Sequence, residues 1–100
     1  MVTENNPMWS YTESHPPENG GYEREVDFFM DAMLYKLNHN RHKGKWEDLD
    51  LKATLKKLRD EVDELEKAMH EGNAIEIILE AADVANYAMI AANIAIRDGG

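Results

Sequence analysis

Two pairs of acidic residues are the part of the sequence best suited to chemistry. Glu61 and Glu64 form one pair and Glu80 and Asp83 the other, each spaced i,i+3. Residues three apart are neighbours on one face of an α-helix. Two such helices, joined by a tight turn at Gly72-Asn73, would run antiparallel and bring the four carboxylates together. Because like charges this close repel one another, we expect a cation among them and interpret it as a metal ion.

The segments that carry these acids have the hydrophobic pattern of helices. Apolar residues recur at steps of four and three along residues 50–71, which places them in one stripe: Leu51, Leu55, Leu58, Val62, Leu65 and Met69. Asp50 is a candidate N-cap of this helix, and Gly72 a candidate left-handed stop. A further helix is expected at 74–97, after the candidate N-cap Asn73. It is apolar almost all round, which is typical of a helix covered on most sides.

If this last helix is buried, its carboxylates carry a free-energy cost unless they are paired. Glu80 and Asp83 have no Lys or Arg on their own helix before Arg97, and a buried carboxylate needs a partner or a metal. The alternative is a non-catalytic helical oligomerisation or binding module, in which the acids pair with three cations: Lys57, Arg59 and Lys67. Such pairing explains the first acid pair well and the second badly, which favours a metal site.

Length and charge narrow the function classes. A chain of 100 residues is one domain with a small core. We expect an all-α helical bundle that is completed by oligomerisation, because the long apolar helix exceeds what one thin bundle can hide. A homodimer or a homotetramer built as a dimer of dimers fits this need. The formal net charge of -9 argues against a nucleic acid polymer as partner.

Cysteine usage and hydropathy narrow the cellular location. The chain has no cysteine, so it has no disulfide or zinc–cysteine site, which fits a cytoplasmic protein. The longest uncharged run near the C-terminus, Val84–Ile96, is too short to span a bilayer. We therefore expect no membrane partner.

The first half of the chain is expected to supply an arm and one more helix. Residues 1–21 hold all three prolines and are expected to form an arm, flexible or docked on a neighbouring subunit. The helical domain is expected at 22–100, with its first helix at 22–42. The apolar face of that helix is interpreted as core filling, and it consists of Val26, Phe29, Met30, Met33, Leu34 and Leu37.

The basic residues gather ahead of the acids. Eight of the eleven Lys and Arg residues lie between Lys36 and Arg59. A basic patch beside an acidic, metal-holding patch suits a small polyanion carried with its metal, and a mixed solvated surface is the alternative. Lys43 and Lys45 are candidate substrate contacts. Trp46 is either a core plug or a platform on which a base stacks.

The arrangement Glu-x-x-Glu, a short break and Glu-x-x-Asp resembles the MazG-like, all-α nucleoside triphosphate pyrophosphatase superfamily. Its relatives include dimeric deoxyuridine triphosphatases and phosphoribosyl-ATP pyrophosphatase. The resemblance covers roughly residues 34–96 and is strongest to short, single-domain, phage-like members. It rests on the acid pattern, on Lys43-Gly44-Lys45-Trp46 and on the run from Glu80 to Asn86.

The resemblance implies a reaction and a ligand set. It implies Mg²⁺-dependent hydrolysis of a (deoxy)nucleoside triphosphate between the α and β phosphates, giving the monophosphate and pyrophosphate. The implied Mg²⁺ ligands are four carboxylates: Glu61, Glu64, Glu80 and Asp83. Carboxylate-only ligands independently suit Mg²⁺ or Mn²⁺, whereas di-iron bundles need Glu-x-x-His pairs, and the last helix has no His. The family often has Glu-Glu-x-x-Glu, so the role of Asp60 at the first position is open.

Three further residues complete the candidate site. Lys57 precedes Glu61 by one turn and either holds a phosphate oxygen or pairs with Glu61. The candidate catalytic residues are Glu61, Glu64 and Lys57. Asn86 follows Asp83 by one turn, and a buried Asn must hydrogen-bond something. Tyr87 is expected on the same flank, bordering the nucleotide, so that both are candidate substrate contacts.

Overall fold

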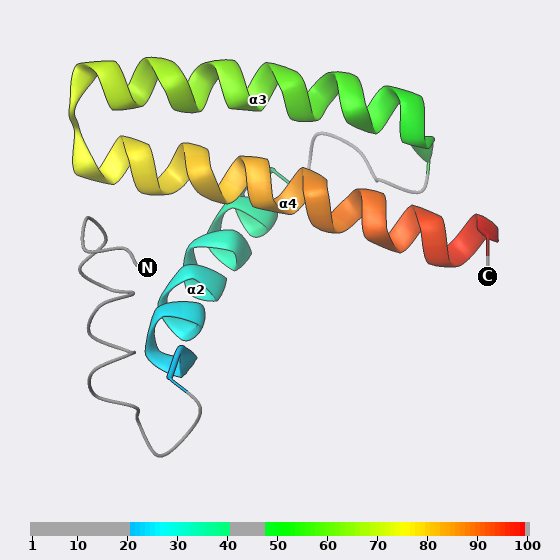
Figure 1. Cartoon of the computed structure of the whole chain (residues 1–100), viewed down its shortest axis with the longest axis horizontal. Coiled ribbons are helices and arrows are strands. Elements are labelled where there is room, and N and C mark those ends of the chain that lie inside the picture. The colour runs from blue at the N-terminus through cyan, green and yellow to red at the C-terminus, as the bar shows by residue number, and fades with distance from the viewer. Residues whose placement is uncertain (1–20, 41–47, 100) are drawn as a thin grey trace, which may run out of the picture. The chain divides into compact units, whose positions relative to one another are not determined.

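The protein is all-α over the residues that the structure describes, which are 21–40 and 48–99 of a computed structural model. Its helices are α2 (Glu23–Asn40), α3 (Leu51–Glu71) and α4 (Ala74–Gly99), and no strand occurs in the described ranges. Figure 1 shows them in chain order. The predicted all-α class is confirmed, and the predicted helix bounds of 50–71 and 74–97 agree with α3 and α4 to within two residues.

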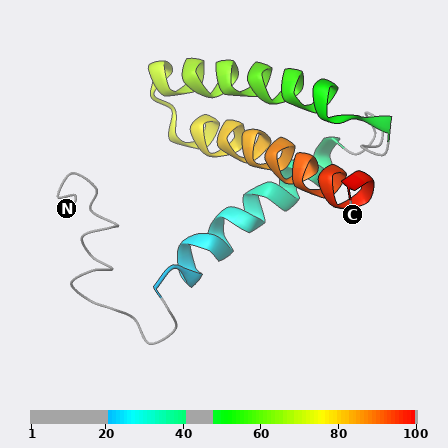
Figure 2. The ribbon, with the colours of Figure 1, turned by 45° about the vertical axis from the view of Figure 1, so that its right-hand side comes forward.

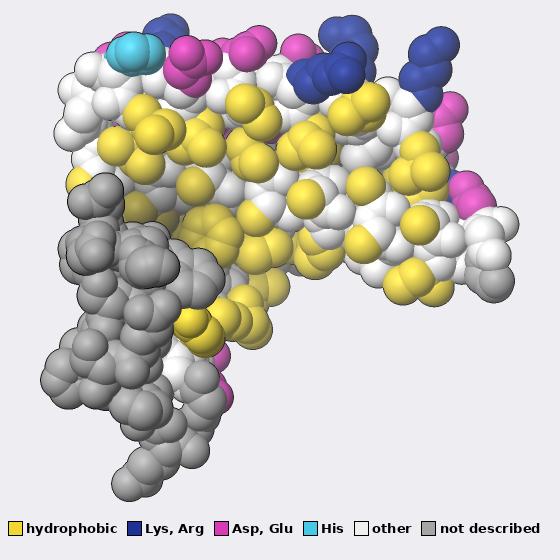
Figure 3. All heavy atoms as spheres, in the orientation of Figure 1, with side chains coloured by type: hydrophobic (Ala, Val, Ile, Leu, Met, Phe, Trp, Pro, Cys, Tyr) yellow, Lys and Arg dark blue, Asp and Glu magenta, His cyan; other side chains and the backbone are white. Residues whose placement is uncertain are grey.

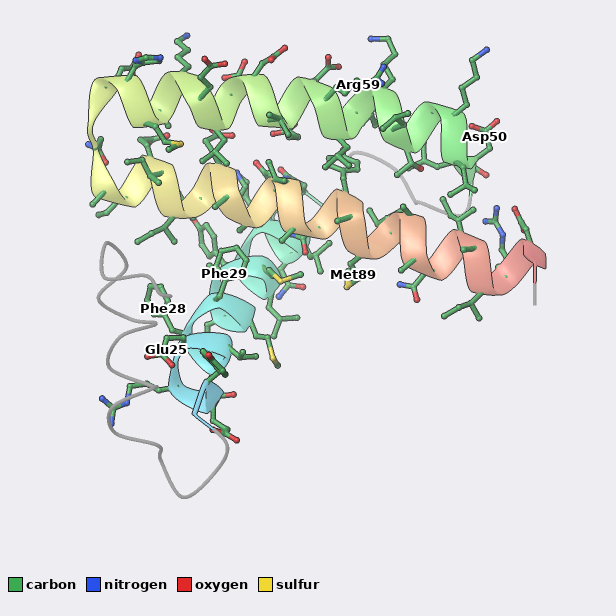
Figure 4. All side chains as sticks on the ribbon, viewed as in Figure 1. Glu25, Phe28, Phe29, Asp50, Arg59 and Met89 are labelled. Carbon is green, nitrogen blue, oxygen red and sulfur yellow. The ribbon has the colours of Figure 1, made fainter. Side chains whose placement is uncertain are left out.

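The chain divides into two compact units, Met1–Met30 and Asp31–Gly100, so that the boundary falls inside α2. In the described part of the first unit, the backbone N–H of Val26 donates to the carbonyl of Tyr22 at 2.9 Å and begins the helix. Figure 4 shows the side chains of Phe28 and Phe29 on this part of α2. The predicted boundary at residue 21 adjoins the undescribed residues 1–20 and stays a prediction.

No side chain of α2 is buried. Val26, Met30 and Leu34 are each about half exposed, at 50%, 49% and 53%. The other three residues of the predicted apolar face, Phe29, Met33 and Leu37, are half-buried. Within one chain this face is therefore partly covered but does not lie in a core.

Asp50 starts α3 as the sequence predicts. Its carboxylate accepts the backbone N–H of Ala53 at 2.7 Å, and its carbonyl accepts the hydroxyl of Thr54 at 2.7 Å. The Asp50 backbone is extended, with φ -111° and ψ 178°. The first of these bonds satisfies a backbone N–H that a helix start leaves without a partner inside the helix.

A two-residue turn joins α3 to α4. Gly72 adopts the left-handed conformation, with φ 78° and ψ 14°, and its N–H donates to the carbonyl of Ala68 at 2.9 Å. The side-chain oxygen of Asn73 then accepts the N–H of Glu76 at 3.0 Å and begins α4. Glycine suits the first position because it carries no Cβ to clash there. The predicted stop and N-cap are confirmed.

Helices α3 and α4 lie side by side and antiparallel, as Figures 1 and 2 both show. Their contact is made by small residues of α3, since Thr54 and Ala68 are its only buried residues. On α4 the buried residues are Ala82, Asn86, Ile90 and Ile94. Small side chains let two helices approach closely, so the contact flank of α3 is the one that carries Thr54 and Ala68.

The predicted apolar stripe of α3 lies beside this contact flank. Leu58 and Leu65 are half-buried, but the remaining four stripe residues are between 46% and 60% exposed: Leu51, Leu55, Val62 and Met69. On α4, Ile75 and Ile96 are also exposed. The expectation that α4 is covered on most sides holds within one chain for residues 77–91, which are half-buried or buried except Ala88, and fails toward the two ends of the helix. In the described ranges, no helix combines the length and hydrophobicity that crossing a membrane requires.

Candidate metal centre

Three carboxylates meet where α3 faces α4. Glu61 of α3 and Glu80 and Asp83 of α4 each place an oxygen within 4.8 Å of the others, and all three side chains are half-buried. Glu61 lies seven residues from both Thr54 and Ala68, so all three occupy one flank of α3. The packing of that flank against α4 brings the carboxylates together.

Glu64 does not belong to this group. Its side chain is exposed, and with Glu80 it borders an open depression near the turn, whose lining is Glu64, Lys67, Ala68, Glu71, Glu76 and Glu80. Its charge still contributes to raising the pKa values of Glu61 and Glu80. Of the four predicted ligands, the structure therefore brings three together and leaves Glu64 at the edge of their cluster.

The clustered acids are electrostatically strained. Burial raises the pKa of Glu61, and the charges of Asp83 and Glu80 raise it further. Burial likewise raises the pKa of Glu80, followed by the effect of Asp83. The pKa of Tyr87 is raised by burial first and then by Glu61 and Asp83, so this half-buried phenol lies close to the cluster. A cation among the carboxylates would relieve their repulsion.

Lys36 is the residue of this site that sequence reasoning missed. Its Nζ lies 3.2 Å from Oδ2 of Asp83, and the two side chains are only 17% and 14% exposed. Its charge also partly offsets the raised pKa values of Glu61 and Glu80. The signal was present, because Lys36 is the single Lys or Arg between Asp31 and Asn40 and follows the apolar Met33 by one turn.

Asn86 ties the second half of α2 to α4. It is buried, with 4% of its surface exposed, and its side-chain nitrogen donates to the carbonyl of Met33 at 3.1 Å. Its side-chain oxygen is also buried but has no hydrogen-bond partner in the described part of the chain. Buried polar atoms are normally paired, so this oxygen is an acceptor left open one turn after Asp83.

The remaining candidate residues lie apart from the cluster or outside the described residues. Lys57 is exposed, and it forms no ion pair within the described ranges. The cation that acts on Glu61 is Lys36 of α2. Lys43, Lys45 and Trp46 fall in the range 41–47, which the structure does not describe.

The ion pairs of α3 differ from those expected for a non-catalytic module, in which Lys57, Arg59 and Lys67 would pair with the acids. Lys56 contacts Asp60 at 3.6 Å, and His70 contacts Glu66 at 3.8 Å. Within residues 21–40 and 48–99, the cations Lys57, Arg59 and Lys67 form no ion pair with the clustered acids. Asp83 instead takes its partner from another helix.

Comparisons of the chain with protein-family models, with curated proteins and with solved structures find no match.

Proposed function

We propose that the chain is a Mg²⁺-dependent nucleoside triphosphate pyrophosphohydrolase, which cuts (deoxy)nucleoside triphosphates between the α and β phosphates. The observation that carries this proposal is the meeting of Glu61, Glu80 and Asp83 from two helices within 4.8 Å. The resemblance of the acid pattern to MazG-like pyrophosphatases supplies the reaction. We place the enzyme in the cytoplasm, as a homodimer or a dimer of dimers.

The cluster suits a small divalent cation. Oxygens that bind one Mg²⁺ at about 2.1 Å lie at most about 4.2 Å apart, so small side-chain rotations would bring this group into range. All donors are oxygens, which Mg²⁺ and Mn²⁺ prefer. In the proposal Glu61, Glu80 and Asp83 hold the ion, while Glu64 stands at the border as a further ligand. When bound, Mg²⁺ would neutralise phosphate charge and polarise the phosphoryl group that is attacked.

The chain's own cations would position the substrate. Lys36 holds Asp83 and lies close enough to Glu61 and Glu80 to affect their pKa values, so it can meet a phosphate oxygen beside them. Lys57 lies one turn before Glu61 on α3 and is exposed, so it is a second candidate to contact a phosphate oxygen. Positioning and fixed charges of this kind account for most catalysis at phosphoryl centres. The proposed base platform Trp46 and the phosphate contacts Lys43 and Lys45 stay predictions.

Pyrophosphate release tests this function directly. The full chain is incubated with a panel of nucleoside and deoxynucleoside triphosphates, with Mg²⁺ or with EDTA. We expect monophosphate and pyrophosphate to appear only with Mg²⁺, and Glu61→Gln, Glu80→Gln and Asp83→Asn each to lose at least about tenfold in turnover. Asp63→Asn is the matched control, because it removes an exposed α3 acid outside the cluster. Failure of every nucleotide to release pyrophosphate would rule the function out.

A second function is favoured by one observation. The ion pair between Lys36 and Asp83 supplies the partner that the sequence of α4 lacks, which suits a non-catalytic oligomerisation or binding module. In that case the acids serve packing alone. Millimolar Mg²⁺ would then leave the melting temperature unchanged, whereas the enzyme should be stabilised by Mg²⁺ through the cluster.

A further inference from the structure

A row of exposed apolar side chains runs along α3, and we name it the α3 ridge: Leu51, Leu55, Val62 and Met69. Their exposed fractions are 51%, 46%, 46% and 60%. In Figure 3 hydrophobic side chains cover this face of α3 and continue onto α4. Because this row lies beside the flank that packs on α4, the hairpin itself leaves it uncovered. Contiguous exposed apolar surface of this kind marks an interaction site.

Charge is segregated along the same helix. The first half of α3 carries Lys52, Lys56, Lys57 and Arg59, and from Asp60 to Glu71 the helix is acidic apart from Lys67 and His70. Figure 3 shows dark blue side chains gathered toward the start of the helix and magenta ones along the rest of its outer edge, with dark blue again near its end. Two such helices in parallel would place like charges side by side. Two antiparallel copies would place opposite charges together.

We propose that the α3 ridge is the surface on which a second copy of this chain packs, with the two α3 helices antiparallel about a two-fold axis near Val62. This inference concerns assembly and does not depend on the proposed hydrolase activity. A two-fold axis needs a surface that is complementary to itself. Leu55 and Met69 each lie seven residues from Val62, so the axis places Leu55 opposite Met69 of the second copy.

The charges bordering the ridge fit the same register. Arg59 and Glu66 both lie on the border of the ridge that faces away from α4, and Figure 4 shows Arg59 pointing away from α4. The axis near Val62 brings Arg59 within one residue, about 1.5 Å along the helix, of Glu66 of the second copy. The two-fold makes this pair twice. Arg59 forms no ion pair within the described ranges, and Glu66 contacts only His70 there, at 3.8 Å.

Cysteine cross-linking tests the face and the axis. The chain contains no cysteine, so a single introduced thiol is a clean reporter. Under mild oxidation we expect Val62→Cys to give a disulfide-linked dimer in most molecules. Asp60→Cys is the control, because it stands at nearly the same level on the opposite side of α3 and should cross-link at least about tenfold less. Equal cross-linking of the two variants would overturn the proposal.

Charge exchange tests the register without touching an apolar residue. Sedimentation equilibrium of the full chain should show a dimer at micromolar concentration. Arg59→Glu and Glu66→Arg should each weaken association at least about fivefold, and the double variant should restore it. A wild-type monomer, which is expected if the chain's own N-terminal segment covers the ridge, would overturn the proposal. The proposal would also be overturned if the double variant dimerised no more tightly than either single variant. Circular dichroism checks that all variants are folded.

Discussion

The balance between Lys36 and the three carboxylates governs the candidate site at the scale of single residues. One ammonium, 3.2 Å from Asp83, faces acids whose pKa values are raised at Glu61 and Glu80. Without a further cation the folded protein therefore carries unrelieved repulsion. Protonation, amidation of a carboxylate or a bound divalent ion would each reduce it.

This repulsion predicts how stability depends on pH. A carboxyl group whose pKa is higher in the folded than in the unfolded state holds more protons when folded, so stability falls as pH rises through the interval between the two values. The interval begins near the ordinary glutamate value of 4.5. We expect the melting temperature in EDTA to decline from pH 4.5 towards neutrality.

Two variants check the source of this decline. Glu61→Gln should flatten the pH profile and raise the melting temperature at pH 7, because it removes one of the repelling charges. Asp63→Asn should keep the wild-type slope. A profile that rises across the same interval in EDTA would contradict the sign of the effect.

Replacing Lys36 by Met separates its structural and electrostatic effects. The variant leaves Asp83 without its partner, at a cost of about 1–3 kcal/mol, which corresponds to a fall of about 4–8 °C in melting temperature per kcal/mol for a domain of this size. It should also bind Mg²⁺ more tightly, because the competing ammonium is gone. Isothermal titration calorimetry and thermal unfolding measure the two effects.

Lys56→Met is the control for this prediction. Lys56 pairs with Asp60 at 3.6 Å while both side chains are largely exposed, at 79% and 62%. Exposed pairs contribute at most about 1 kcal/mol. A Lys36→Met variant as stable as Lys56→Met, with unchanged affinity for Mg²⁺, would show that Lys36 does not compete for the cluster.

At the scale of elements, the site depends on the α3–α4 hairpin holding its register. The cap at Asp50 and the left-handed turn at Gly72 define where α3 begins and ends, and the turn sets where Glu80 and Asp83 meet Glu61. The turn has only two residues to adjust, so an error of one residue there would rotate the acids of α4 by about 100° away from α3.

Gly72→Ala tests the strain that this turn tolerates. An added Cβ meets no atom within 4 Å, so the cost comes from the positive φ of 78° alone, and about 1–2 kcal/mol is expected. Gly99→Ala also meets no atom but lacks a positive φ, so it should be nearly neutral. Chemical denaturation compares the two, and equal stabilities would mean that the turn adapts its backbone.

At the scale of the whole molecule, the uncovered apolar surface is the dominant feature. Within one chain the α3 ridge stays exposed, as do Ile75 and Ile96 of α4. Folding of the separate chain thus leaves apolar area in water that association would remove, at about 25 cal/mol per Å². Stability and assembly should therefore be coupled.

This coupling predicts a melting temperature that rises with protein concentration. Differential scanning calorimetry between micromolar and hundreds of micromolar chain should show the rise. Val62→Ser should largely abolish the concentration dependence, whereas Asp60→Ser, on the opposite side of α3, should retain it. A melting temperature independent of concentration in the wild type would mean that the ridge has no partner of its own kind.

The local features of the fold were predictable from the sequence. The all-α class, the bounds of α3 and α4, the cap at Asp50, the stop at Gly72 and the N-cap at Asn73 all follow from spacing and capping. These act over a few residues, so neighbouring side chains decide them. The antiparallel course of the two acid-bearing helices also follows, because a two-residue turn leaves α3 and α4 little choice but to lie antiparallel.

Only the tertiary structure decided which flank of α3 meets α4. Small residues at Thr54 and Ala68 allow the closer approach, and that choice gathers Glu61 with Glu80 and Asp83 while it leaves Glu64 at the border and the α3 ridge exposed. It also decided that Lys36, 47 positions before Asp83, supplies the partner that α4 lacks. Helical periodicity places a residue on a flank, but the flank that is buried depends on packing between helices distant in sequence, which no local pattern encodes.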